Sequence, residues 1–128
     1  MLLVLVLMVW VSSLEASPDF GNVWQDAIAT NREKCQNDSN VSVTVIENMN
    51  NSEYPDDVTF KSFIKCVYQN SGFMDSEGKI NIETMITNVP SREEEIRQCK
   101  ADVEKVDDLS QRSYDLLLCF RKFLSRHQ

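Results

Sequence analysis

Four cysteines, at positions 35, 66, 99 and 119, are the residues of this chain best suited to covalent chemistry. A catalytic thiol needs a histidine base, and a structural zinc site needs closely spaced Cys or His ligands. The only histidine is His127, and no two cysteines stand in a Cys-x-x-Cys spacing. The even count instead predicts two disulfides in an oxidising compartment, and four cysteines allow three pairings. We therefore expect neither an enzyme nor a bound metal or other cofactor.

Residues 75–80 resemble the centre of a calcium-binding loop. With Gly78 as the sixth residue of such a loop, the first and last ligand positions fall on Phe73 and Thr84. Neither residue supplies the carboxylate that calcium needs at these positions. The segment is expected to form a turn.

The N-terminus carries the pattern of a secretion signal. The apolar run from Leu2 to Val11 is too short to span a bilayer, which takes about 20 residues, and the small residues Ser12, Ser13 and Ala16 follow it. We expect residues 1–16 to be a signal peptide and residues 17–128 to be one secreted domain without stable membrane insertion. Loss of Glu15 would leave 19 acidic and 13 basic residues, a net charge of −6. This acidic balance argues against binding to nucleic acid.

Hydrophobic residues recur at helical spacing along most of the chain, and only three glycines and three prolines interrupt them. This pattern predicts an all-α fold of six short helices. The expected helices cover residues 20–34, 41–49, 55–72, 81–89, 91–106 and 110 to beyond 123. The third has the clearest apolar stripe, formed by Phe60, Phe63, Ile64, Val67 and Tyr68.

Local signals should set several helix ends. Cys35 should close the first helix, and the polar residues 37–40 should form a loop. Gly72 is the expected stop of the third helix, and Asn81 should cap the fourth. Ser91 to Glu94 reads as a capping box that opens the fifth.

Three glycosylation sequons begin at Asn37, Asn40 and Asn50. All lie in or beside the polar region between the first and third helices. A secreted chain exposes such sequons to the glycosylation enzyme. We treat them as possible modification sites that are incidental to function.

The cysteine spacing and the segment Gly72–Lys79 resemble the insect odorant-binding proteins, the family of pheromone-binding and general odorant-binding proteins. That family has six helices and six cysteines, with three residues between the second and third cysteines and eight between the fifth and sixth. Cys35, Cys66, Cys99 and Cys119 match the first, third, fourth and sixth. The family often follows its third cysteine with a segment like Gly72–Lys79.

Serines stand where the family has its second and fifth cysteines, at Ser62 and Ser110. Those two cysteines pair with each other in the family, so the chain resembles its four-cysteine "minus-C" subclass. The resemblance implies the pairs Cys35–Cys66 and Cys99–Cys119. Packing alone would then join the third and sixth helices, and we expect a more adaptable cavity than a six-cysteine relative would have.

The resemblance also implies an apolar cavity that carries small hydrophobic ligands, such as odorants or pheromones, through sensillum lymph or another body fluid. A membrane olfactory receptor would be at most an indirect partner, and the carrier would be a monomer or weak homodimer. Tyr54 or Tyr114 would orient an alcohol, ester or aldehyde group. The expected ligand-binding residues are Met49, Tyr54, Phe60, Phe63, Val67, Phe73, Met74, Met85, Ile86, Tyr114, Leu117, Leu118 and Phe123.

Two alternatives stay open from the sequence. A secreted helical signalling or venom-type protein would act through its surface around a solid core. A carrier of the same fold would work in a fluid unrelated to olfaction.

Overall fold

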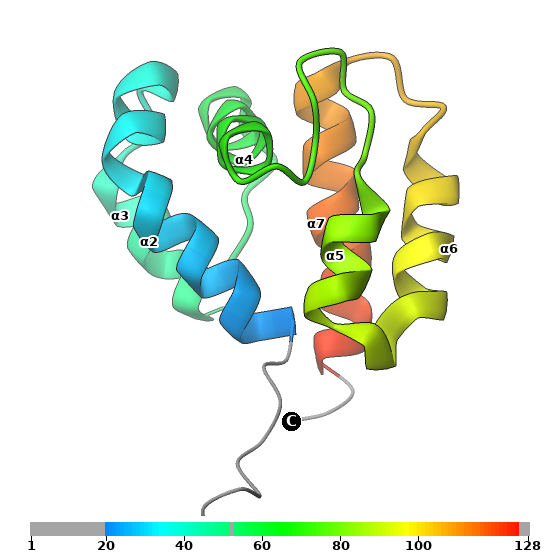
Figure 1. Ribbon diagram of the computed structural model, residues 1–128. Coiled ribbons are helices and arrows are strands. Elements are labelled where there is room, and N and C mark those ends of the chain that lie inside the picture. Colours follow the sequence, from blue (N-terminus) through cyan, green and yellow to red (C-terminus); the bar gives the residue numbers. More distant parts are fainter. Residues whose placement is uncertain (1–19, 52, 126–128) are drawn as a thin grey trace, which may run out of the picture.

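The computed structural model describes residues 20–51 and 53–125, and within them the chain is helical (Figure 1). The α-helices are α2 (Phe20–Ser39), α3 (Val43–Asn48), α4 (Val58–Asn70), α5 (Ile82–Asn88), α6 (Glu93–Val103) and α7 (Leu109–Ser125). Two 3₁₀ turns, η2 (Met49–Asn51) and η3 (Pro90–Arg92), join some of them. The all-α prediction is confirmed, and the expected signal peptide lies outside the described residues. In residues 20–51 and 53–125, no helix combines the length and apolar character needed to cross a membrane.

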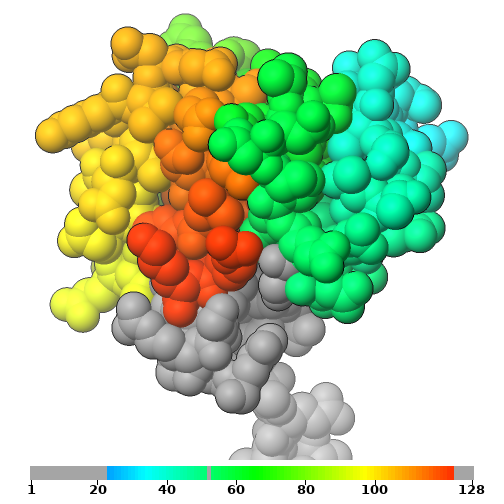
Figure 2. Space-filling model, turned by 180° about the vertical axis from the view of Figure 1, so that it is seen from behind, coloured from blue at the N-terminus to red at the C-terminus, as the bar shows by residue number. Residues whose placement is uncertain are grey.

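Helix α4 lies at the centre of the arrangement. Figure 1 shows α2 and α3 on one side of α4, with α5, α6 and α7 on the other. Helix α4 packs against both α2 and α7, and α6 packs against α5 and α7. From behind, α7 reaches the surface between α6 and α4 (Figure 2).

The first helix is longer than the sequence predicts. It continues past Cys35 and ends at Ser39, so the expected loop over residues 37–40 is wrong for its first three residues. The helix extends this far because the residue that ends it is Asn40. Asn40 has a φ of 63°, the left-handed conformation that Asn tolerates, and its N–H donates to the Gln36 carbonyl at 2.9 Å.

The capping box expected before the fifth helix is also wrong. Pro90 opens the turn η3, and the Arg92 N–H donates to the Val89 carbonyl at 3.0 Å. Because the chain already turns there, α6 begins only at Glu93, and its N-cap position makes no side-chain hydrogen bond. The helix ends at Val103 rather than at residue 106.

Other helix ends follow the expected capping chemistry. Gly72 has a φ of 83° just after α4, and the Asn81 side chain accepts from the Thr84 N–H at 3.3 Å. Helix α4 begins three residues after Pro55, because Asp57 is its N-cap and accepts from the Phe60 N–H at 3.1 Å. Capping by a carboxylate places negative charge at the positive end of the helix dipole.

The turn predicted at residues 75–80 is confirmed, and it is anchored to α7. The Asp75 carboxylate accepts from the N–H groups of Glu77 and Lys79, each at 2.9 Å. The Arg112 guanidinium donates to the Gly78 carbonyl at 2.9 Å and to the Val106 carbonyl at 2.8 Å. One α7 side chain therefore positions two separate loops.

The backbone conformation of Gly78 and the nearby Leu109 side chain both favour glycine at this position, which gives a stability prediction. Its φ is 88°, and an added Cβ would lie 2.2 Å from a terminal carbon of Leu109. Gly78→Ala should lower the free energy of unfolding by about 1–3 kcal/mol, mostly through left-handed strain and partly because the half-buried Leu109 side chain must move. Gly72→Ala is the matched control, because its φ is 83° but nothing lies within 4 Å of the added Cβ. Urea unfolding should show the smaller loss at Gly72, and equal losses would contradict this account.

The Asp57 cap predicts a dependence of stability on acid. Hydrogen bonds from the Thr59 hydroxyl and then the Phe60 N–H lower the pKa of Asp57 below its usual 3.8. A lowered pKa in the folded state stabilises the fold above about pH 4, and this contribution is lost as the pH falls through the lowered value.

Wild type should therefore resist urea better than Asp57→Ala at pH 7, and the gap between their unfolding midpoints should shrink between pH 4 and pH 2. Asp107→Ala, in an exposed loop, controls for the loss of one carboxylate. A gap that stays constant with pH would rule out the cap as its source.

Candidate ligand-binding core

Two disulfides frame the core of the protein. Cys35 and Cys66 join α2 to α4 with a Cα–Cα distance of 5.5 Å, and Cys99 and Cys119 join α6 to α7 at 5.7 Å. These are the pairs that the family resemblance implies. No bridge joins α4 to α7, because all four cysteines are used.

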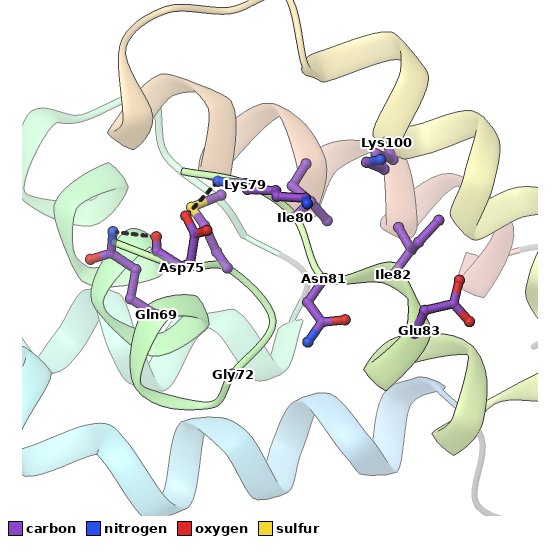
Figure 3. Close-up of a pocket in the computed structure, with 10 residues that line it drawn as sticks. Gln69, Gly72, Asp75, Lys79, Ile80, Asn81, Ile82, Glu83 and Lys100 are labelled. Carbon is purple, nitrogen blue, oxygen red and sulfur yellow. Dashed lines mark hydrogen bonds between the residues drawn. The ribbon is translucent and has the colours of Figure 1, made fainter. Parts of the chain in front are cut away.

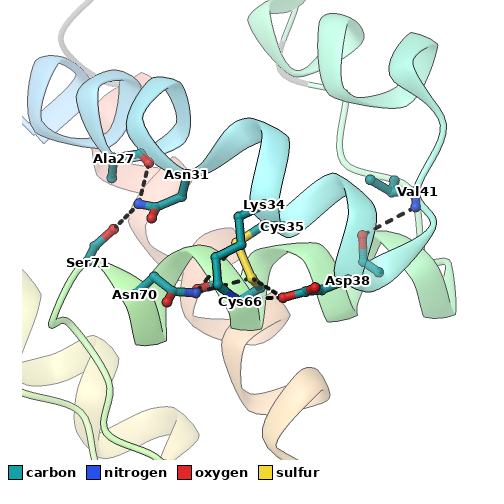
Figure 4. Close-up of a disulfide and its surroundings, with 10 residues drawn as sticks. Ala27, Asn31, Lys34, Cys35, Asp38, Val41, Cys66, Asn70 and Ser71 are labelled. Carbon is teal, nitrogen blue, oxygen red and sulfur yellow. Dashed lines mark hydrogen bonds and ion pairs between the residues drawn. A yellow bond between two sulfur atoms is a disulfide. The ribbon is translucent and has the colours of Figure 1, made fainter.

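Polar contacts surround the first bridge where it approaches the surface (Figure 4). The Asn31 amide donates to the Ala27 carbonyl at 2.9 Å and to the Ser71 hydroxyl at 3.1 Å. The Asn70 amide donates to the Cys66 carbonyl at 2.8 Å. Of these bonds, the one from Asn31 to Ser71 joins α2 to the residue that caps the end of α4, whereas the other two lie within α2 and within α4.

Most of the predicted ligand-binding residues lie together in this interior. Tyr54, Ile86 and Leu118 are partly buried against it, and the side chain of Phe123 lies outside the described set. The buried members are Met49, Phe60, Phe63, Val67, Phe73, Met74, Met85, Tyr114 and Leu117. Burial alone does not separate residues that contact a ligand from residues that pack the core, so their role stays a prediction.

An aromatic group connects the segment before α4 to α7. The Tyr54 ring stacks on Phe60 with centroids 6.2 Å apart, and Phe60 meets Tyr114 edge-on at 6.0 Å. The Tyr114 hydroxyl donates to the Tyr54 carbonyl at 2.8 Å. This bond joins residues that are far apart in the sequence, and it occupies the proton of the Tyr114 hydroxyl.

Two cations lie over these rings. The Arg121 guanidinium is 4.9 Å from the Tyr54 centroid, and the Lys61 ammonium is 5.2 Å from the Tyr114 centroid. Burial raises the pKa of Tyr54, and Arg121 opposes part of that rise. Burial and then the Asp56 carboxylate raise the pKa of Tyr114. Both phenols are therefore neutral at physiological pH.

Tyr68 is a candidate site residue that is not among the ligand-binding residues expected from the sequence. It is 1% exposed, and its ring lies 5.2 Å from Trp24 and 6.4 Å from Phe73. Its hydroxyl has no hydrogen-bond partner among the described residues. The helical stripe predicts that Tyr68 is buried, but no sequence signal shows that its hydroxyl lacks a partner.

The surface grooves include only a few of the predicted residues. A groove of about 640 Å³ is lined by Met74, Ile80 and Ile82 but also by charged groups such as Lys79 and Asp75 (Figure 3). Smaller pockets, of about 300 and 320 Å³, lie beside Tyr54 and Phe73. The charged wall of the large groove would leave an apolar ligand in contact with water. The buried core is therefore the better candidate site.

Comparison with known proteins places this architecture in a family. The family model described as the PBP/GOBP family matches residues 20–123, which include all four cysteines. No curated protein and no solved structure matches the chain. The match covers most of the chain, and the structure adds the all-helical fold with two disulfides that the resemblance implies. The chain therefore belongs to the PBP/GOBP family, the insect pheromone- and odorant-binding proteins.

Proposed function

We propose that this protein is a secreted carrier that reversibly binds small hydrophobic ligands, such as odorants or pheromones, within its helical core. The observation that carries the proposal is the family match over residues 20–123. The carrier would hold its ligand in extracellular fluid and act as a monomer or weak homodimer. A membrane receptor would meet the ligand rather than a stable complex with the carrier.

The composition of the core supports this function. Met49, Met74 and Met85 are buried in the same core cluster as the buried aromatic side chains, and methionine is flexible enough to adapt to ligands of different shape. Burial of an apolar ligand among such groups gains roughly 25 cal/mol per Å² of surface removed from water. The hydrophobic interior can therefore supply affinity without any charged group.

One observation favours the surface-acting alternative. Phe60, Phe63, Ile64 and Val67 are each 0% exposed, and a signalling protein with a solid core would show the same burial. Binding of an apolar probe separates the two functions. The tissue of expression would then separate olfactory transport from a carrier in another fluid.

The oxidised protein should bind N-phenyl-1-naphthylamine with a micromolar Kd, because the naphthyl probe becomes buried among apolar side chains. Fluorescence titration measures the binding, and a panel of alcohols, esters, terpenoids and fatty acids should displace the probe selectively. A folded sample with both disulfides confirmed by mass spectrometry is the necessary control. If such a sample takes up no probe, the carrier function fails.

A third disulfide should stiffen the junction of α4 and α7. Ser62 and Ser110 are partly buried on these two contacting helices. Their neighbours already meet, since the Lys61 ammonium donates to the Gln111 side chain at 2.6 Å. Ser62→Cys with Ser110→Cys should form a bridge worth about 4 kcal/mol in the chain-entropy model. The Tm of the double variant should be higher than that of wild type, and fewer of the competitor compounds should bind to it.

The reduced double variant and the single variant Ser62→Cys are the controls for this bridge. Thiol alkylation followed by mass spectrometry counts the free cysteines. Two free thiols in the folded, oxidised double variant would contradict the alignment of Ser62 and Ser110 with the family's second and fifth cysteines.

A further inference from the structure

The Tyr68 hydroxyl is a buried donor without a partner among the described residues. Buried polar groups in folded proteins are nearly always hydrogen-bonded, so each exception calls for an explanation. A phenylalanine at this position would fill almost the same space without the cost of an unpaired hydroxyl. A function that uses the hydroxyl accounts for the presence of tyrosine.

The other two tyrosines are less suited to bind a polar atom of a ligand. The Tyr114 hydroxyl already donates its proton to the Tyr54 carbonyl at 2.8 Å. Tyr54 is only partly buried, borders a surface pocket with Val45, and has Arg121 over its ring. Tyr68 is the tyrosine whose donor is both fully buried and free of a protein acceptor in the described part of the chain.

The position of Tyr68 on α4 places it inside the predicted ligand site. Phe60, Ile64 and Tyr68 are spaced four residues apart and share one buried face of the helix. The side chains of a helix lean toward its N-terminus, which is the end where Tyr54 stacks on Phe60. The hydroxyl therefore lies among apolar and aromatic groups that a hydrophobic ligand would contact.

The electrostatic surroundings favour a neutral ligand. Burial, followed by the nearby phenol of Tyr54, raises the pKa of Tyr68 well above its usual value. The Arg121 guanidinium lies over the Tyr54 ring and makes no hydrogen bond to the Tyr68 hydroxyl. An ionised ligand would pay a large desolvation cost at this depth, whereas a neutral carbonyl would accept a hydrogen bond.

We propose that the Tyr68 hydroxyl selects neutral ligands with an oxygen acceptor, such as ketones, aldehydes or esters, over hydrocarbons and carboxylates of the same skeleton. This selectivity rests on the carrier function proposed above. The apolar core supplies most of the affinity, and the single hydroxyl fixes the orientation of the oxygen.

The test uses three ligands with one carbon skeleton: limonene, its ketone carvone, and the anion of perillic acid. Each displaces N-phenyl-1-naphthylamine from wild type, Tyr68→Phe and Ser113→Ala at pH 7. The preference of wild type for carvone over limonene should fall about 3- to 10-fold in Tyr68→Phe. Ser113→Ala is the control, because it removes a buried α7 hydroxyl that already donates to the Leu109 carbonyl at 2.7 Å, and it should keep the preference.

Thermal unfolding without ligand gives a second readout. Tyr68→Phe should match or exceed the Tm of wild type, because it removes an unpaired hydroxyl, whereas Tyr114→Phe should melt earlier. A clear loss of Tm in Tyr68→Phe would mean that its hydroxyl is already bonded in the free protein, and would overturn the proposal. If the variant does not fold, the carbonyl ¹³C shift of carvone bound to wild type decides. A value typical of hydrogen-bonding solvents supports the proposal, and one typical of cyclohexane overturns it.

The outcomes separate this inference from the function on which it rests. If wild type binds carvone and limonene but Tyr68→Phe keeps the same preference, the carrier function stands and the role of Tyr68 is wrong. If wild type binds perillate as tightly as carvone, the assignment to neutral ligands is wrong. If wild type binds none of these compounds and no probe, the carrier function itself fails.

Discussion

The burial of α4 on two sides is the constraint on which the other helices depend. Phe60, Phe63, Ile64 and Val67 have no exposed surface, and α2 and α7 pack against the helix that carries them. Full burial of each such side chain contributes roughly 1.5–3 kcal/mol. The helices α2 and α7 thus obtain much of their stability from the same partner. The core forms where these three helices meet.

The two disulfides divide the molecule into two parts that packing holds together. One bridge belongs to α2 and α4, and the other belongs to α6 and α7. Between α4 and α7 the described contacts are non-covalent, among them the edge-on pair of Phe60 and Tyr114 and the hydrogen bond from Lys61 to Gln111. Such contacts can separate and re-form without chemistry. In the proposed carrier, this junction is where the core would open to a ligand.

The sequence predicts the parts of this fold that repeat along a helix. The stripe on α4 follows from the spacing of Phe60, Phe63 and Ile64, and it is buried as expected. The ends of helices are harder to predict from the sequence, because a single local hydrogen bond or turn can extend or delay a helix against the preference of its residues. The left-handed Asn40 keeps polar residues helical up to Ser39, and the turn that begins at Pro90 displaces the expected capping box.

Prediction from the sequence is limited in the candidate site as well, where hydrogen-bond partners lie far apart in the chain. The spacing of residues in α4 predicts that Tyr68 faces inward, but the state of its hydroxyl depends on the whole surrounding structure. The contrast with Tyr114 makes this clear, because its acceptor, the Tyr54 carbonyl, lies 60 residues away in the chain. No local pattern predicts which tyrosine will find such a partner. The resemblance to the family supplied the disulfide pairing, but it did not distinguish one tyrosine from another.

The contrast between these hydroxyls bears on how an apolar core can be selective. Hydrophobic burial has no direction, so it gives affinity to many ligands and orientation to none. A hydroxyl bonded within the protein, as in Tyr114, fixes the fold but offers little to a ligand. An unpaired buried hydroxyl, as in Tyr68, costs the free protein about 1–3 kcal/mol, a cost that a ligand with a matching acceptor removes. One such group among flexible methionines would allow broad tolerance of shape together with a preference for one kind of polar atom.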